Sequence, residues 1–194
     1  MQVQKLTTDY FNQVHDLIKF YSERRLMLPL SLDELYHRAQ AYRIIVEDNS
    51  DRYPAKQGFA SDVATKEVGI MRSMCSAKEN ELDFGKKPMG TVLACAHLDI
   101  FTPQLAEIKS LAVIETEHGR GYGKTLVEDC EQDAKAIGIK KLFVLTFQQD
   151  FFGKLGYQVV DRDTLPEKVY KECVKCSYYQ DCKEIAMVKV LTHT

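Results

Sequence analysis

Apolar residues recur at helical spacing early in the chain, along residues 10–21. This period predicts an amphipathic helix, for which Thr7 or Thr8 can serve as the N-cap. A second helix is expected to begin at Ser31, because Ser31 stands three positions before Glu34 in the pattern of a capping box. The N-terminal part of the chain therefore predicts two successive helices.

The pattern changes at residues 42–46, which predict a strand. Residues 48–89 then become mostly polar and small. We expect an insertion there that is partly a hairpin and partly mobile. Loops of this length are uncommon in compact domains unless they are functional or disordered, so the insertion is a candidate cover for a substrate site.

Regular patterns return after residue 90. Two strands are expected at residues 91–98 and 106–113, followed by a glycine-rich turn, a helix that Gly138 closes and a buried strand at residues 142–145. Strand, turn, helix and strand form a βαβ unit. This unit predicts an α/β or α+β sheet with helices packed on it.

The C-terminal part predicts smaller elements: a short helix at residues 151–155, a strand at 157–160, helical turns at 166–173 and a terminal strand at 185–191. The 194 residues suffice for one domain with a substantial core. We therefore predict a single domain over residues 1–194, with an insertion at 48–89 and a cysteine-containing segment at 164–184.

Composition narrows the class of protein. The chain is 45% hydrophobic and 28% charged, and its 26 Lys and Arg against 28 Asp and Glu give 26 − 28, a formal charge of −2. This balance argues against a nucleic-acid partner, which usually selects a basic surface. No apolar run reaches about eighteen residues and the N-terminus lacks the pattern of a secretory signal, so we expect a cytoplasmic protein with no membrane partner.

The glycine-rich turn between the second strand and the helix carries the first chemical signal. It reads His-Gly-Arg-Gly-Tyr-Gly-Lys over residues 118–124. Backbone N–H groups at the start of a helix can converge on an anion, and glycines permit its close approach. The glycine spacing does not fit the Rossmann fingerprint, and His118 stands where a P-loop needs glycine. The turn therefore predicts a phosphate site outside both standard nucleotide motifs.

Three stretches together resemble the core of the GNAT-type, acetyl-CoA-dependent N-acetyltransferases: Ala-Glu-Ile-Lys-Ser-Leu-Ala-Val at 106–113, the glycine-rich turn, and Phe-Gly-Lys-Leu-Gly-Tyr at 152–157. Three further stretches, at residues 28–35, 142–146 and 165–168, are similar to the acetyltransferase part of N-acetylglutamate synthases and their stand-alone relatives. The resemblance implies a mixed, V-splayed sheet flanked by helices.

The resemblance also implies acetyl-CoA as co-substrate. The family turn usually reads (Arg/Gln)-x-x-Gly-x-(Gly/Ala); Gly121 and Gly123 fit it, whereas His118 replaces Arg or Gln. The cofactor-binding residues carried over in this way are Leu111, Ala112, Val113, His118, Gly119, Arg120, Gly121, Tyr122, Gly123, Lys124, Thr125, Phe151 and Phe152.

An acceptor amine is mostly ammonium at neutral pH, so a base must remove a proton before nitrogen attacks the thioester. The resemblance places that base at Glu107, and burial in a strand would raise its pKa into a useful range. The alternative is an ordinary strand carboxylate that faces solvent. The resemblance further implies that the backbone N–H of Val113, or of a neighbour, polarises the thioester carbonyl. Phe152 stands where a tyrosine usually protonates the CoA thiolate, which leaves Thr146 or water for that role.

A dicarboxylate acceptor needs cationic partners. Arg25 and Lys109 are the candidates near segments expected to line the cleft, although Leu30 stands where the glutamate synthases are expected to have Arg. We expect a small-molecule amine substrate, such as glutamate or a related amino acid. A protein or peptide amine, received by the acidic residues of the insertion, and a non-catalytic acetyl-CoA-binding module are the alternatives. A homodimer is left open.

Three cysteines near the C-terminus have a spacing that suits zinc. Cys173, Cys176 and Cys182 would supply three thiolates, with Cys75, His193 or an acidic neighbour as a fourth ligand. Reduced thiols packed in this segment, and a redox-reactive pair, are the alternatives. Zinc at this place would act as a structural clip, because acetyl transfer does not call for a metal.

Overall fold

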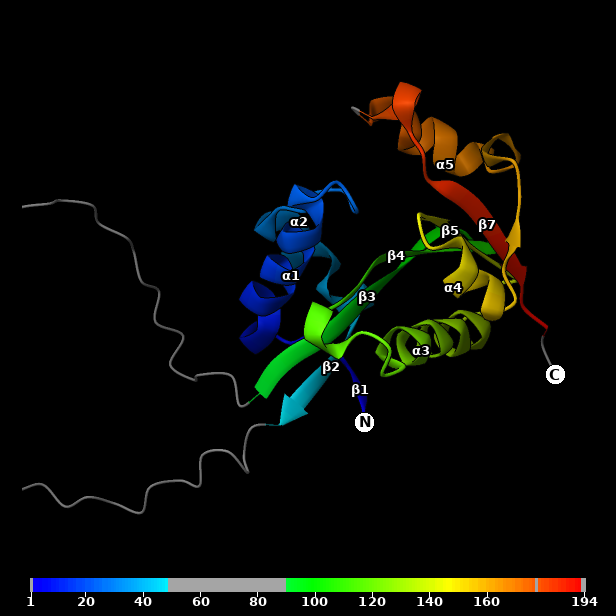
Figure 1. Ribbon diagram of the computed structural model, residues 1–194. Helices are drawn as coiled ribbons and strands as arrows, with labels where there is room; N and C mark the ends of the chain where they lie inside the picture. Colours follow the sequence, from blue (N-terminus) through cyan, green and yellow to red (C-terminus); the bar gives the residue numbers. More distant parts are fainter. Residues whose placement is uncertain (1, 49–89, 177, 193–194) are drawn as a thin grey trace, which may run out of the picture.

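A mixed seven-stranded sheet organises the molecule (Figure 1). The computed structural model describes residues 2–48, 90–176 and 178–192. The strands follow the order β1-β2-β3-β4-β5-β7-β6. Their bounds are β1 Val3–Lys5, β2 Tyr42–Asp48, β3 Gly90–Thr102, β4 Leu105–Val113, β5 Lys141–Thr146, β6 Gln158–Val159 and β7 Ile185–Val190. The expected α/β architecture with a mixed sheet is confirmed.

Five α-helices of the described residues flank this sheet: α1 Phe11–Glu23, α2 Leu32–Arg38, α3 Tyr122–Ala136, α4 Gln149–Lys154 and α5 Pro166–Lys171. Short 3₁₀ turns join them: η1 Thr8–Tyr10, η2 Ala39–Ala41, η3 Glu115–Glu117, η4 Arg162–Thr164, η5 Cys173–Lys175 and η6 Tyr179–Asp181. The insertion expected at 48–89 lies, apart from Asp48, outside the described residues. Its flanking residues Asp48 and Gly90 are antiparallel partners.

The helices cover both faces of the sheet because its strands alternate apolar side chains between the faces. Ile44 packs with α1 and α2, whereas the adjacent Ile45 packs with α3 and α4. Arg43 adds a polar tie, because its buried guanidinium pairs with Asp129, at 3.2 Å, and with Asp133, both on α3. The sheet therefore fixes the position of α3.

The sheet opens between β4 and β5. These parallel strands pair only over residues 105–107 of β4 and 141–143 of β5, and then diverge. Figure 1 shows the resulting gap between α1 and α2 on one side and α3, α4 and α5 on the other. This divergence is the V-splay that the sequence resemblance implies.

Beyond the point of divergence, β4 carries a bulge. Its register against β3 runs from Cys95↔Ala112 to His97↔Lys109, so β4 has one more residue than β3 in between. Ser110 lies in this bulge with a φ of 50°. Its Oγ accepts a hydrogen bond from the Tyr42 hydroxyl at 3.2 Å, so β2 helps to hold the bulge.

Two predictions of helix capping had different outcomes. The box at Ser31 is confirmed, because its side chain and Glu34 bond reciprocally to each other's backbone N–H. The prediction of Thr7 or Thr8 as the cap of α1 is wrong. The chain enters through η1 instead, and Tyr10 takes the N-cap position without a side-chain bond.

None of the described helices has the length and apolarity needed to cross a membrane.

His97 is a buried titratable group of this fold. It is 3% exposed and its ring stacks on Tyr42 with centroids 4.7 Å apart. Burial lowers the pKa of His97 to about 4, although Asp99 opposes the effect. Between an unfolded pKa of about 6.5 and this native value, the unfolded chain binds the extra proton. His97 therefore lowers stability as the pH falls through that window.

We expect acidification from pH 7 to pH 4 to destabilise the wild type more than His97→Phe, by up to about 3 kcal/mol. Urea unfolding at several pH values measures this difference. The exposed His37 provides the control, because His37→Phe should follow the wild type. Parallel losses in wild type and His97→Phe would contradict the assignment.

Candidate functional site

Glu107 lies where the sheet splits. It is the last residue of β4 that pairs with β5, opposite Phe143, and its partner on β3 is Asp99. Its side chain is 3% exposed. The expectation of a buried carboxylate is therefore confirmed, and the alternative of a solvent-facing residue is wrong.

Two lysines and two further carboxylates surround Glu107. Lys168 donates from Nζ to Glu107 Oε2 at 2.8 Å, and Lys109 Nζ lies 3.4 Å from the same oxygen. Both lysines contact Glu172 at 2.7 Å, and Lys109 also contacts Asp99 at 2.7 Å. We call these five residues the Glu107 network. It joins β3 and β4 to the segment at residues 164–184, which contains α5.

The network shifts the pKa values of its members. Burial raises the pKa of Glu107, against the opposing effect of Lys168 and Lys109. Burial would lower the pKa of Lys168, but the carboxylates of Glu107 and Glu172 raise it above its ordinary value. Partial burial of Glu172 is outweighed by hydrogen bonds from both lysines, which lower its pKa to about 2. With all five groups ionised, two ammonium groups against three carboxylates give 2 − 3, a formal charge of −1.

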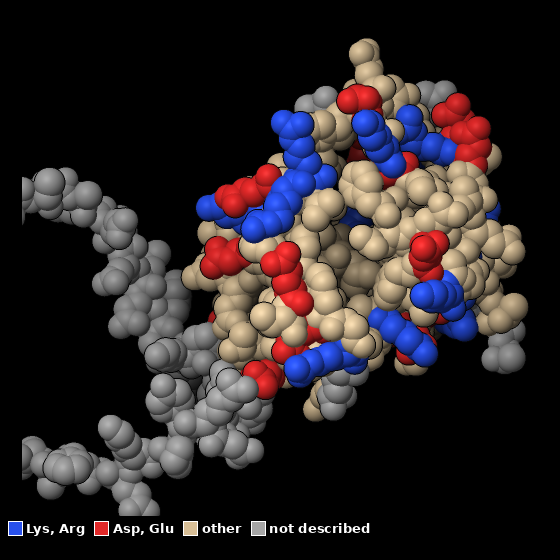
Figure 2. All heavy atoms as spheres, in the orientation of Figure 1, with Lys and Arg blue, Asp and Glu red and all other residues tan. Residues whose placement is uncertain are grey.

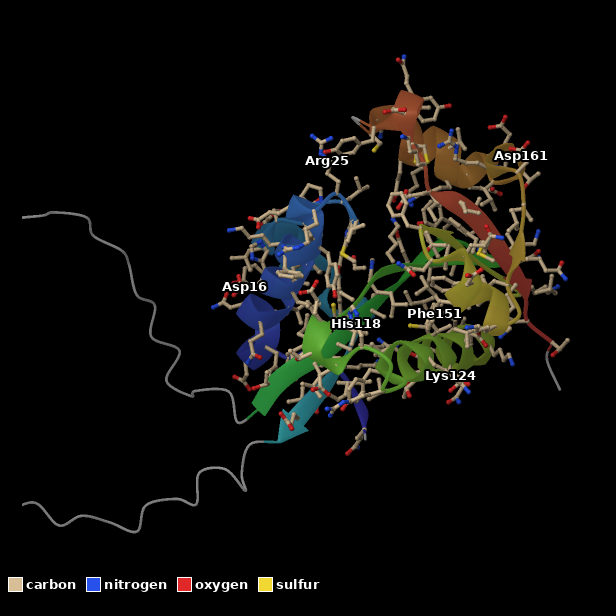
Figure 3. All side chains as sticks on the ribbon, in the orientation of Figure 1. Asp16, Arg25, His118, Lys124, Phe151 and Asp161 are labelled. Atoms are coloured by element: carbon tan, nitrogen blue, oxygen red, sulfur yellow. The ribbon has the colours of Figure 1, made fainter. Side chains whose placement is uncertain are left out.

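The two cations predicted to bind the acceptor differ in exposure and in whether they already form ion pairs. Lys109 is 15% exposed and contacts three carboxylates of the network. Arg25 is exposed and forms no ion pair within the described residues. It lies at the rim of the gap, between the end of α1 and the α5 side (Figure 3). Of these two predicted cations, Arg25 is therefore the one available to pair with a carboxylate from outside.

Arg25 has an unusual backbone. The C-terminus of α1 closes with hydrogen bonds from the N–H of Arg25 to Ser22 O and from the N–H of Leu26 to Tyr21 O. This Schellman arrangement needs a left-handed residue, normally glycine, and Arg25 supplies it with a φ of 57°. Strain of this kind is frequent at functional sites.

The glycine-rich turn opens toward solvent at the start of α3. Gly119 and Gly121 have φ values of 79° and 88°, and Gly121 is the N-cap of α3 without a side-chain bond. A methyl group on Gly121 would meet no described protein atom within 4 Å. The space beside Gly121 at the start of α3 is therefore open, as an anion site at a helix N-terminus needs.

His118 is placed differently from its expected role. Its Nε2 lies 2.9 Å from the Val113 carbonyl oxygen and 2.9 Å from the Tyr21 hydroxyl, which donates to the same carbonyl. His118 thus ties the end of β4 to α1. Figure 3 shows it near the floor of the gap, with Phe151 to one side and Lys124 turned away below α3.

Several other side chains of the turn already have partners within the protein. Arg120 pairs with Glu117 at 3.0 Å, and Lys124 pairs with Glu128 at 3.7 Å. Thr125 Oγ1 donates to Gly121 O at 3.2 Å. The positive charge that this turn offers an anion therefore comes mainly from the backbone N–H groups. The remaining predicted residues are wholly or partly packed in the two cores: Tyr122, Leu111, Ala112 and Val113.

Phe151 and Phe152 lie on different sides of α4. The ring of Phe151 reaches the turn, because a methyl group on Gly123 would lie 3.3 Å from its Cζ. Phe152 is 4% exposed and packs edge-on against Tyr157 in the core. Thr146 is buried at the end of β5, where its Oγ1 accepts from the N–H of Gln148 at 2.9 Å. Phe151 and Thr146 therefore remain the candidates on the α4–β5 side of the gap. Phe152 is part of the core instead.

The cysteines do not gather as a zinc site would require. Cys173, Cys176 and Cys182 are free thiols, and Cys182 donates to Glu184 at 3.7 Å. No three His, Cys, Asp or Glu side chains of the described residues could hold a metal ion together. Two of the fourth ligands considered, Cys75 and His193, lie outside the described residues. The described part of the chain therefore gives no support to the zinc interpretation, whereas Cys173 is buried in the segment, as a packed thiol would be.

Sequence reasoning did not place Lys168 beside Glu107, and it missed Asp99, Glu172 and Tyr21. Part of the signal was available. Glu107 and Lys109 are two positions apart, so their side chains lie on the same face of the strand. Lys168 and Glu172 have i,i+4 spacing, which places them on one helix face. What the spacing could not show is that the two faces meet.

Comparisons with known proteins agree with this geometry. The sequence model of the acetyltransferase (GNAT) family matches residues 40–157. An uncharacterised N-acetyltransferase of Chlorobaculum tepidum is 39% identical over 102 residues, which are 53% of this chain and 66% of that protein. An amino-acid acetyltransferase of Mycobacterium tuberculosis is 30% identical over 83 residues, 43% of this chain and 48% of that protein. The chain thus spans about half to two thirds of these relatives.

Two solved structures share the fold. N-acetylglutamate synthase from Neisseria gonorrhoeae, complexed with coenzyme A and N-acetyl-glutamate, superposes with a TM-score of 0.72 at 20% identity, covering 99% of this chain and 35% of that one. A Mycobacterium tuberculosis protein in complex with CoA and NLQ superposes with a TM-score of 0.65 at 20% identity, covering 99% and 100%.

Arg25→Gly tests the backbone strain at the rim. Because glycine adopts the left-handed conformation without a Cβ clash, we expect the free energy of unfolding to rise by up to about 1 kcal/mol. Urea denaturation measures it. Arg24→Gly is the matched control and should lose stability, since Arg24 has a φ of −90° and its guanidinium covers the Phe20 ring. A loss of stability in Arg25→Gly would contradict the strain.

Proposed function

Because this chain belongs to the acetyltransferase (GNAT) family, we propose that it transfers the acetyl group of acetyl-CoA to the amino group of a small amino acid, glutamate or a related acid. The observation that carries the proposal is the position of Glu107, a buried carboxylate at the point where β4 and β5 part. The space-filling view shows a hollow beside this split, between the two halves of the molecule (Figure 2).

The start of α3 fits the anionic part of acetyl-CoA. The N–H groups that follow Gly121 have no side-chain cap, and their partial positive charge suits a pyrophosphate. Phe151 and Val113 border Gly123, so the turn continues into an apolar wall. Acetyl-CoA bound there would direct its thioester along β4 toward Glu107.

The chemistry then follows from Glu107. Its carboxylate takes a proton from the acceptor ammonium, and the freed nitrogen pair attacks the thioester carbonyl carbon. The C–S bond breaks as the tetrahedral intermediate collapses, and the second proton of the attacking nitrogen passes through water or the Thr146 hydroxyl to the CoA thiolate. Burial supports the base role, because it raises the pKa of Glu107 toward the pH at which proton transfer is efficient.

Arg25 supports the choice of an acidic acceptor. It is the exposed cation of the two predicted for this role, and a guanidinium can bind a carboxylate through two parallel hydrogen bonds. Figure 2 shows further Lys and Arg side chains along the upper rim of the hollow. An acceptor with a side-chain carboxylate would place its amino group inward, toward Glu107.

Gly121→Ala tests the cofactor site. Gly121 and Gly138 flank α3 with the same φ of 88° and the same open surroundings, so alanine at either position costs a similar strain. Only the methyl group at Gly121 enters the proposed pyrophosphate site. We expect acetyl-CoA affinity to fall at least about tenfold in Gly121→Ala and to stay unchanged in Gly138→Ala, by isothermal titration calorimetry. Equal affinities in both variants would place the cofactor elsewhere.

Glu107→Gln tests the base. A CoA-release assay with acetyl-CoA should show turnover of an acidic amino acid by the wild type, and kcat about 10²- to 10⁴-fold lower in the variant, because the amide cannot accept the proton. Acetyl-CoA affinity should be unchanged. The panel includes glutamate, glutamine, polyamines and lysine peptides.

Each outcome of this assay bears on one part of the proposal. Full activity in Glu107→Gln would overturn the base role. Turnover of lysine peptides alone would overturn the small acidic acceptor. Arg25→Gly provides a separate readout, since it should raise KM for the acidic acceptor and leave KM for acetyl-CoA unchanged.

A further inference from the structure

The segment at 164–184 approaches Glu107 through one lysine. Lys168 is 5% exposed and Glu107 is 3% exposed, and their charged atoms are 2.8 Å apart. They are 61 residues apart in the chain, so only the fold brings them together. Lys168 also bonds Glu172, one helical turn further on, at 2.7 Å. Its ammonium group is thus held between a buried and a half-buried carboxylate.

This arrangement fixes the carboxylate of Glu107. A buried carboxylate without a partner would relax toward solvent or become protonated. Here Lys168 holds Oε2 from the α5 side while Lys109 approaches the same oxygen from its own strand. Neither lysine donates a hydrogen bond to the other carboxylate oxygen, Oε1, so it is the atom that remains for an acceptor amine.

We propose that Lys168 is a positioning residue for Glu107, so that the segment of α5 forms part of the catalytic apparatus. This inference rests on the proposed function, in which Glu107 is the base. It assigns to the segment a role that does not depend on its cysteines.

The charged and titratable groups that face Glu107 come from several elements. β5 contributes the apolar Phe143 in register with Glu107. The polar groups are Asp99 and His97 of β3, Lys109 of β4, Lys168 of α5, Glu172 after α5 and Cys173 of η5. Lys168 is the closest cation, and Glu172 is the carboxylate that competes with Glu107 for both lysines.

Two substitutions should therefore shift Glu107 in opposite directions. Loss of the Lys168 charge disfavours the ionised carboxylate, since a cation within about 4–6 Å lowers an acid's pKa by 1–3 units. Loss of the Glu172 charge leaves both lysines to act on Glu107 and Asp99, which favours the ionised carboxylate. A merely structural role would not produce shifts of opposite sign.

The test is the pH dependence of kcat/KM for the best acceptor of the panel. We expect the acidic limb to move up by about 1 pH unit or more in Lys168→Met, and to move down in Glu172→Gln. Lys168→Arg keeps the charge and should restore the limb to its wild-type position. Lys171→Met is the matched control, because Lys171 is exposed on the same helix, and it should leave the limb unchanged.

The failures are distinguishable. Acidic limbs unchanged in Lys168→Met and Glu172→Gln, with Glu107→Gln inactive, would overturn the positioning role and leave the base role intact. An active Glu107→Gln would overturn the base role itself. Acetyl-CoA binding, measured by calorimetry, shows whether each variant is folded. If Lys168→Met does not fold, the direction of the shift in Glu172→Gln decides: a downward shift supports the proposal, and no shift or an upward shift overturns it.

Discussion

Parallel strands hold together only while their backbones pair, and β4 and β5 stop pairing at Glu107 and Phe143. Past this point each strand has one side without a neighbour in the sheet. Backbone N–H and C=O groups buried in such a gap need partners, and a ligand that lies between the strands can supply them. The early end of the pairing thus separates the two strands just beyond Glu107, and β4 continues from there toward the glycine-rich turn at the start of α3.

Ion pairs compensate the charge of Glu107. A carboxylate with 3% exposure is costly unless cations and hydrogen bonds compensate it. Lys168 and Lys109 provide that compensation, while Asp99 and Glu172 keep both lysines in place. The formal charge of −1 that remains is complementary to an incoming ammonium group. The same network that stabilises Glu107 therefore favours the substrate that the proposed reaction needs.

Local signals in the sequence predicted much of this arrangement. The capping box at Ser31 and the glycine turn were readable, because each depends on residues within a few positions of one another. The partners of Lys109 were not readable in this way: Glu172 lies 63 residues away, and only the fold shows that Lys109 is already paired. The same holds for His118, whose partner Tyr21 is 97 residues distant.

Resemblance supplied what local pattern could not, but only at the level of positions. It indicated Glu107 and the turn, and it aligned Phe152 with a residue that usually contacts the cofactor. In the structure, α4 turns Phe152 into the core and Phe151 toward Gly123. The cysteine spacing is ambiguous for a related reason: it places thiols near one another along the chain without aiming them at one point, and no metal-binding group forms among the described residues.

Backbone strain gives an independent indication of where function lies. Among the described residues, Arg25 and Ser110 are the non-glycine residues with positive φ, and they lie just after the end of α1 and in the bulge of β4. Such conformations persist only where surrounding contacts hold them. The Schellman bonds at the end of α1 hold Arg25, while the Tyr42 hydroxyl and the Cys95 thiol bond to Ser110. Glycine would serve either backbone without strain. The Ser110 hydroxyl is explained by the hydrogen bond that it accepts from Tyr42, whereas the exposed Arg25 guanidinium, which forms no ion pair among the described residues, is left for the proposed acceptor.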